Sequence, residues 1–126
     1  MMWRNILLVG LGGGIGSILR FLCQKYLYEW NPHPFPFGTF LVNICGCFLI
    51  GLFQGIAEKG NIFTPEWRLL LTAGFCGGFT TFSTFAVENI NLLKSGSFLY
   101  FGLYTSGSVI LGIAAAYGGM ILFKLI

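Results

Sequence analysis

The stretch "LLLTAGFCGGFTTFSTFAV", residues 69–87, decides the fold because it contains no charged residue and is about long enough to cross a membrane. A hydrocarbon core requires about 20 consecutive apolar residues in a helix. Two further uncharged runs, residues 30–57 and residues 95–123, also reach that length. A fourth run, residues 5–19, reaches it when Arg20 lies inside the membrane or at its edge. The sequence therefore predicts four transmembrane helices.

Composition agrees with a membrane protein. Of the 126 residues, 56% are hydrophobic and 9% are charged, whereas soluble domains are about 25% charged. We expect residues 1–126 to form a single transmembrane bundle, with an uncleaved first helix, because no small-residue cleavage site leads into a polar mature domain. The net charge of +3 is too small and too scattered to indicate nucleic-acid binding.

Positive charges give only a weak preference for one orientation in the membrane. Four spans place both termini on the same side as the connection between the second and third helices. That side has four Lys and Arg residues: Arg4, Lys59, Arg68 and Lys124. The opposite side has two or three: Lys25, Lys94 and, if it is counted, Arg20. Because Lys and Arg near helix ends set orientation, two interpretations stay open, a fixed topology and a dual topology that allows an antiparallel homodimer.

Prolines and capping residues indicate where helices begin. The connection "WNPHPFPFG", residues 30–38, contains three prolines and is expected to be a loop or an interrupted entry to the second helix. Before the third helix, Thr64 is expected as the N-cap, with Pro65 at the first helical position and Glu66 in the first turn. These signals predict that the third helix begins at residue 65.

Glycines in the first helix favour close packing. The segment "GLGGGIGS", residues 10–17, resembles a nucleotide-binding loop, but Ile15 replaces the third glycine. Spacing of four residues between small side chains lets helix backbones approach closely in lipid. Four pairs have this spacing: Gly10/Gly14, Gly12/Gly16, Gly51/Gly55 and Ser108/Gly112.

The four cysteines lie within the predicted spans, and we expect them to be small buried residues. Cys45 and Cys47 are two residues apart, so on a helix they point in different directions and do not form a disulfide or a zinc pair.

The segment "GFCGGFTTFSTF", residues 74–85, predicts a break in the third helix. Gly77 and Gly78 weaken helix propensity just before two β-branched threonines. Irregular backbone at membrane depth occurs only where protein or water satisfies it, so a break would expose carbonyl oxygens to a polar or cationic partner. The spacing is equally compatible with a tightly packed helix whose hydroxyls bond to their own carbonyls.

Aromatic and polar residues in the same region favour a path for a small anion. On a helix, four phenylalanines fall along one stripe: Phe75, Phe79, Phe82 and Phe85. Ring edges are electropositive, and hydroxyl and amide groups donate hydrogen bonds, so together they suit an anion better than a cation. Further polar residues lie in the other spans: Asn43 in the second, Tyr104 and Ser108 on one face of the fourth, and Arg20 toward one end of the first.

Three stretches together resemble the Fluc/CrcB family of fluoride channels: "GGGIGSILR" at 12–20, "GTFLVNICGCFLIG" at 38–51 and "GFCGGFTTFSTF" at 74–85. The resemblance covers essentially the whole chain. It implies an all-α membrane protein of four transmembrane helices with a break in helix three. It further implies a dual-topology, antiparallel homodimer in the inner (plasma) membrane, whose two pores export fluoride passively and relieve fluoride toxicity.

The resemblance also implies roles for individual residues. Phe82 and Phe85 would line the pore through their ring edges, and Asn43 would donate to fluoride. The carbonyls of Gly77 and Thr80 from both subunits would hold a structural Na⁺. The remaining implied pathway residues are the hydroxyls of Ser83 and Thr84, the fourth-helix residues Tyr104 and Ser108, and Arg20 at the vestibule. Some relatives have another hydroxyl one turn beyond Ser108, where this chain has Gly112.

Three other classes of membrane protein are alternatives, and the first two require particular residues. A small dual-topology multidrug exporter needs a carboxylate within the membrane, and Glu88 is the only candidate. An intramembrane enzyme needs a nucleophile and base or a metal set, whereas this chain has no Asp and one loop histidine, His33. A structural subunit without ion flux is the third alternative.

Overall fold

The computed structural model describes residues 1–60 and 62–125, and its elements are helices joined by short connections. Four stretches are long and apolar enough to cross a membrane: Met2–Trp30, Phe37–Glu58, Pro65–Lys94 and Phe98–Leu125. The first two are the helices α1 and α2, and the last is α6. The third comprises α3 (Pro65–Leu69), the π-helical segment η1 (Leu70–Cys76), α4 (Gly77–Phe79) and α5 (Phe82–Lys94). The prediction of four spans is confirmed.

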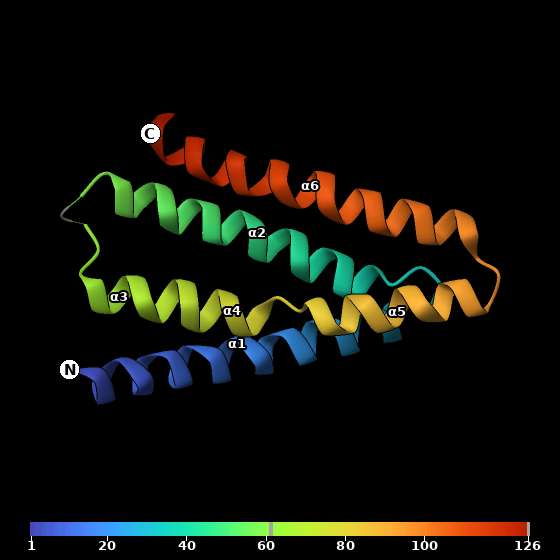
Figure 1. Ribbon diagram of the computed structural model, residues 1–126, viewed down its shortest axis with the longest axis horizontal. Coiled ribbons are helices and arrows are strands. Elements are labelled where there is room, and N and C mark those ends of the chain that lie inside the picture. The colour runs from blue at the N-terminus through green and yellow to red at the C-terminus, as the bar shows by residue number, and fades with distance from the viewer. Residues whose placement is uncertain (61, 126) are drawn as a thin grey trace.

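The four spans lie side by side (Figure 1). Both chain ends and the connection from α2 to α3 lie at one end of the bundle, while the α1–α2 and α5–α6 connections lie at the other. The helix α2 packs along α6, and α1 packs along η1 and α4. Beyond α4 the third span changes its neighbour, since α5 packs against α6. The third span therefore packs on α1 before Thr80 and on α6 after Thr81.

The predicted helix boundaries are confirmed at both proline sites. Residues 31–36 are not helical and form the expected loop between α1 and α2. At the start of α3, the side chain of Thr64 accepts a hydrogen bond from the backbone N–H of Trp67 at 3.2 Å, and Pro65 is the first helical residue. Proline needs no N–H partner there, and the threonine satisfies one of the free N–H groups of the first turn.

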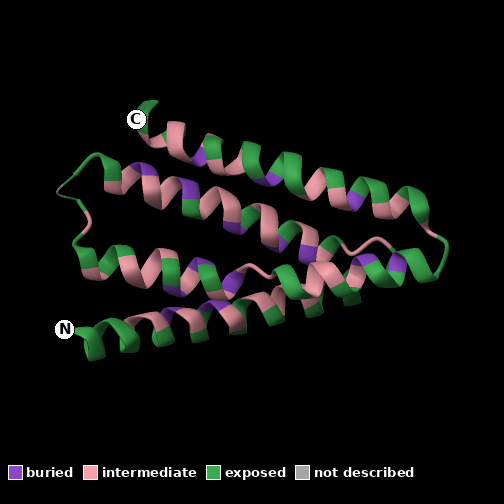
Figure 2. Ribbon diagram, in the orientation of Figure 1, coloured by how far each residue is buried: buried purple, intermediate pink, exposed green. Residues whose placement is uncertain are grey.

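The core lies between the helices, and the outer surface is apolar. Figure 2 shows the buried residues on faces turned toward neighbouring helices. The buried hydrophobic residues are Val42, Cys76, Phe79, Leu92 and Tyr104. Large apolar side chains on the outside, such as Ile18 and Ile113, are 61% and 68% exposed, as expected for helices that face lipid. The prediction that the cysteines are buried is confirmed for Cys76 and is wrong for Cys45, which is exposed, while Cys23 and Cys47 are half-buried.

Close helix packing is observed at some of the predicted small-residue pairs. A Cβ at Gly12 or Gly16 would overlap backbone atoms of the third span. At Gly51 and Gly55 it would meet the backbone of α6. At Gly10 and Gly14 it would meet nothing within 4 Å in the described part of the chain. The second glycine pair in α1, rather than the first, therefore brings α1 against its neighbour.

The third span is not helical at Thr80 and Thr81. Thr80 has φ −88° and ψ 158°, and Thr81 has φ −149° and ψ 119°, which are extended conformations. Gly77 and Gly78 are themselves helical and belong to α4. A Cβ at Gly78 would overlap the carbonyl of Gly13, so this glycine allows α1 and α4 to touch. The β-branched threonines, which suit extended backbone, take the irregular positions instead.

Candidate ion pathway

Asn43 on α2 binds the extended backbone of the third span. Its Oδ1 accepts a hydrogen bond from the N–H of Thr81 at 2.8 Å, and its Nδ2 donates to the carbonyl of Thr81 at 3.1 Å. In a continuous helix that N–H would donate to the carbonyl of Gly77. One amide side chain thus replaces the helical partners of Thr81. Since an amide nitrogen has two hydrogens, the second hydrogen of Nδ2 is available to another acceptor.

Arg20 and Ser17 on α1 bind the carbonyl of Gly78, two residues before Thr80. The Nε of Arg20 donates to the carbonyl of Gly78 at 3.1 Å, and the hydroxyl of Ser17 donates to the same oxygen at 3.4 Å. The guanidinium of Arg20 therefore lies beside the irregular segment. The structure places it against a backbone carbonyl, and Arg20 is not among the residues that line the cavities between the spans.

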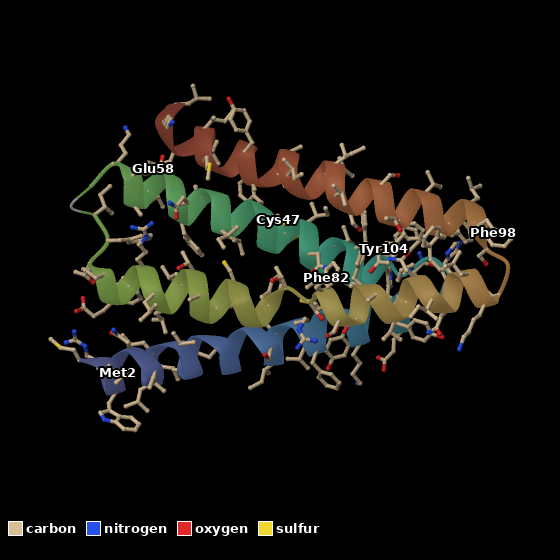
Figure 3. The ribbon with its side chains drawn as sticks, in the orientation of Figure 1. Met2, Cys47, Glu58, Phe82, Phe98 and Tyr104 are labelled. Carbon is tan, nitrogen blue, oxygen red and sulfur yellow. The ribbon has the colours of Figure 1, made fainter. Side chains whose placement is uncertain are left out.

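A large open cavity of about 760 Å³ lies between α2, the third span and α6. Six of the residues implicated by the sequence line it: Asn43, Gly77, Thr80, Phe82, Phe85 and Ser108. Figure 3 shows Phe82 at the start of α5, in the central part of the bundle and far from Phe98 at its end. The ring centroids of Phe82 and Phe85 are 5.7 Å apart, and those of Phe85 and Tyr104 are 4.9 Å apart. The fold thus gathers residues from three spans around one cavity.

Ser108 lines this cavity and has an unpaired hydroxyl. Its Oγ is buried and has no hydrogen-bond partner among residues 1–60 and 62–125. An unsatisfied buried hydroxyl costs about 1–3 kcal/mol. A hydrogen-bond acceptor that reached this hydroxyl would remove that cost.

A second cavity of about 370 Å³ lies on the other side of α5, between α1, the start of α2 and α5. Thr84 lines it, together with Gln24, Lys25, Thr39 and Glu88. The hydroxyl of Thr84 accepts a hydrogen bond from the hydroxyl of Thr81 at 3.1 Å. Of the residues implicated by the sequence, Thr84 therefore lies apart from the six at the larger cavity, and Arg20 and Tyr104 line neither of the two cavities. Ser83 is exposed and lines neither of them.

Glu88 binds two hydroxyl groups from neighbouring helices. The hydroxyl of Thr39 donates to Oε2 at 3.0 Å, and the hydroxyl of Tyr104 donates to Oε1 at 2.9 Å. Tyr104 is fully buried and points to this carboxylate (Figure 3 shows it beside α5). Because Thr39 is 49 residues from Glu88 in the chain, sequence reasoning did not connect them. The one signal was a charged residue beside a polar stripe in a spanning helix.

The fold and the site together define a helical membrane protein in which polar groups and phenylalanine rings surround cavities between four spans. The irregular segment at Thr80 and Thr81 lies at the larger cavity, and Glu88 and Thr39 line the smaller one.

Comparison with known proteins gives the family. Residues 7–120 match the model of the family described as CrcB-like protein, Camphor Resistance (CrcB). A fluoride-specific ion channel FluC of Flavobacterium psychrophilum is 46% identical over 121 residues, which cover 96% of this chain and 98% of the relative. The FluC of Phocaeicola vulgatus is 51% identical over 110 residues, covering 87% and 90%. That of Chlorobaculum tepidum is 46% identical over 125 residues, covering 99% and 98%. The chain belongs to the CrcB family.

The relatives are named as ion channels, which are not enzymes. Family membership agrees with the expectation of a non-enzymatic protein. It gives no support to the multidrug-exporter alternative.

Proposed function

We propose that this protein is a fluoride-specific ion channel that lets fluoride leave the cell passively across the inner (plasma) membrane and so relieves fluoride toxicity. The observation that carries the proposal is the buried, unpaired hydroxyl of Ser108 at a cavity also lined by Phe82, Phe85 and Asn43. A hydroxyl donor without a partner, beside aromatic rings with electropositive edges, suits a small anion. The names of the relatives support fluoride as that anion.

In this mechanism the larger cavity replaces the water that fluoride loses. A bare anion in a low-dielectric interior loses much hydration energy unless several donors are already in position. Ser108 supplies an O–H and Asn43 the second hydrogen of Nδ2, while the edges of Phe82 and Phe85 supply positive partial charge. The two hydrogen bonds between the Asn43 amide and the backbone of Thr81 fix the amide, so little side-chain entropy is lost when the ion binds.

The remaining pathway residues extend the path on both sides of α5. Thr84 lies at the smaller cavity, and the exposed Ser83 is available to an ion where a second subunit covers this face. Tyr104 holds Glu88 at the side of the path. Arg20 adds a positive charge beside the irregular segment, which attracts anions from the vestibule.

We further propose a dual-topology homodimer with two antiparallel pores. The larger cavity is open in the single chain, and Phe82 at its edge is 79% exposed. A second copy would cover the ring and close the cavity. The small difference in positive charge between the two ends supports insertion in both orientations, as an antiparallel dimer requires.

A structural Na⁺ fits the residues at the irregular segment. The N–H of Thr81 donates to Asn43, which leaves the carbonyl of Gly77 without its usual helical donor. Gly77 and Thr80 both line the larger cavity, and backbone carbonyls of unwound helices are suitable ligands for Na⁺. We propose that the two extended residues are the break that allows these carbonyls from two subunits to hold the ion. The ion would supply positive charge at the subunit interface.

The proposal is tested by replacing Ser108 in protein reconstituted into liposomes. Ser108→Ala removes one donor to an anion, so fluoride efflux should fall about 10- to 100-fold. This range corresponds to the loss of about 1.5–3 kcal/mol, the contribution of a hydrogen bond to a charged group. Ser106→Ala is the matched control, because Ser106 lies on the same helix, is exposed and bonds to the carbonyl of Gly102. Equal efflux from both variants would remove Ser108 from the path.

A further inference from the structure

A chain of hydrogen bonds connects all four spans at the smaller cavity. The Nε2 of Gln24 on α1 donates to the hydroxyl of Thr39 on α2 at 2.9 Å. Thr39 donates to Glu88 on α5 at 3.0 Å, and Tyr104 on α6 donates to the other oxygen of Glu88 at 2.9 Å. Thr39 is 3% exposed and Tyr104 is fully buried. The hydrogen bonds that these two residues make to Glu88 are therefore largely shielded from solvent.

The direction of this chain is set at Gln24. A threonine hydroxyl has a single hydrogen, and the NH₂ of Gln24 is only a donor. While Thr39 accepts from Gln24, its own hydrogen is directed to Glu88. If Gln24 presented an acceptor instead, Thr39 would turn its hydrogen toward α1. The lone pairs of Thr39 would then face Oε2 of Glu88 at 3.0 Å, which is repulsive.

The backbone holds Gln24 at this position. A Cβ at Gly38 would lie 3.1 Å from the Cα of Gln24 and 3.4 Å from its carbonyl oxygen. The main chains of α1 and α2 are therefore in close contact one residue before Thr39. Glycine at position 38 allows this approach and keeps the amide of Gln24 within hydrogen-bonding distance of the threonine.

We propose that Gln24 is a positioning residue for anion passage, acting through Thr39 to keep the Glu88 carboxylate capped by two hydroxyl donors. Gln24, Thr39, Thr84 and Glu88 line the same cavity of about 370 Å³. A carboxylate oxygen without its donor would present a bare negative charge to that cavity and repel an anion. The inference rests on the proposed fluoride path, and it adds a residue from α1 that itself need not touch the ion.

Three substitutions at Gln24 separate this role from packing. Gln24→Glu has nearly the same shape but supplies an acceptor, so it should reduce fluoride efflux most. Gln24→Met removes the bond that holds Thr39 but adds no competing acceptor, so it should reduce efflux less than Gln24→Glu, by at most about tenfold, which corresponds to one hydrogen bond of about 1.4 kcal/mol. Gln24→Lys retains an N–H donor and should stay within about threefold of wild type. If packing alone mattered, the nearly isosteric Gln24→Glu would be the mildest change, and that order would overturn the proposal.

A double-mutant cycle with Thr39→Val tests whether Gln24 acts through Thr39. In the Thr39→Val background, Gln24→Met should change neither fluoride efflux nor the melting temperature of the purified protein beyond the effect of Thr39→Val alone. Additive losses in both measurements would overturn the inference.

The melting cycle needs no fluoride, so it separates the two proposals. Efflux from wild-type protein together with an additive melting cycle would defeat the role of Gln24 and leave the channel intact. If the melting cycle is coupled but the wild-type protein shows no fluoride efflux, the hydrogen bonds from Gln24 through Thr39 are confirmed. The proposed channel function, and with it the role of Gln24 in anion passage, is then overturned.

Discussion

At the level of single residues, binding of an anion depends on which hydrogen-bond donors are already occupied. Asn43 uses its oxygen and one N–H on the backbone of Thr81, whereas Ser108 keeps its hydroxyl free. The two residues line the same cavity but contribute differently: Asn43 holds the irregular backbone and offers one remaining hydrogen, and Ser108 offers its only one.

Phe82 provides the residue-scale prediction. Phe82→Ile retains an apolar side chain but removes the electropositive ring edge, so fluoride efflux should fall by about three- to tenfold, in line with aromatic contributions of about 0.5–1.5 kcal/mol. Phe98→Ile is the control, because Phe98 is similarly exposed at 67% but begins α6 at the end of the bundle (Figure 3). Efflux is measured with a fluoride electrode. Equal rates for both variants would show that the ring of Phe82 has no contact with the ion.

At the scale of elements, the structure shows how much of the site the sequence predicts. The spans, the loop at residues 31–36 and the Thr64 cap follow from local signals, namely apolar length, proline and capping chemistry. The position of the irregular segment does not, because Gly77 and Gly78 stay helical while the two threonines extend. Their conformation depends on Asn43, 38 residues away.

The hydrogen bonds that join Gln24, Thr39 and Glu88 were not predicted for the same reason. Glu88, Thr39 and Gln24 come from three different spans, and their hydrogen bonds exist only after the helices pack. No local spacing rule connects them. By contrast, Phe82, Phe85, Asn43 and Ser108 were each recognisable as unusual in a spanning helix, and the structure gathers them at one cavity.

Glycines on α1 give the element-scale prediction. At Gly16 a Cβ would overlap the carbonyl of Phe75 and lie 2.8 Å from the nitrogen of Phe79, so Gly16→Ala should separate α1 from the third span and lower stability by about 1–3 kcal/mol. Gly14→Ala meets nothing within 4 Å among the described residues and should leave stability unchanged or raise it by up to about 1 kcal/mol. Thermal melting of the purified variants measures both effects. Equal melting temperatures would contradict the close contact between the helices.

At the scale of the whole molecule, one chain leaves the proposed path open on one side. The larger cavity opens outward, and Phe82 at its edge is mostly exposed. Both termini lie at the same end of the bundle (Figure 1), so an antiparallel partner would present its termini at the opposite end. The proposed dimer therefore requires that the same chain insert in both orientations.

Dual topology gives the first whole-molecule prediction. Because positive charges favour neither end strongly, a reporter fused to the C-terminus should be found on both faces of the membrane. Accessibility to a membrane-impermeant reagent in intact and lysed cells measures the two populations. A variant with added lysines in the α5–α6 connection, Ser95→Lys with Ser97→Lys, should shift the population toward one orientation. A reporter confined to one face in the unmodified chain would exclude the antiparallel dimer.

In the proposed channel, hydroxyl and amide donors and aromatic ring edges around the larger cavity replace the hydration of fluoride. The most direct test loads liposomes containing the purified protein with equal concentrations of fluoride and chloride and follows the efflux of both ions. We expect fluoride to leave rapidly while chloride stays inside. Comparable efflux of the two halides, or retention of both, would contradict this mechanism.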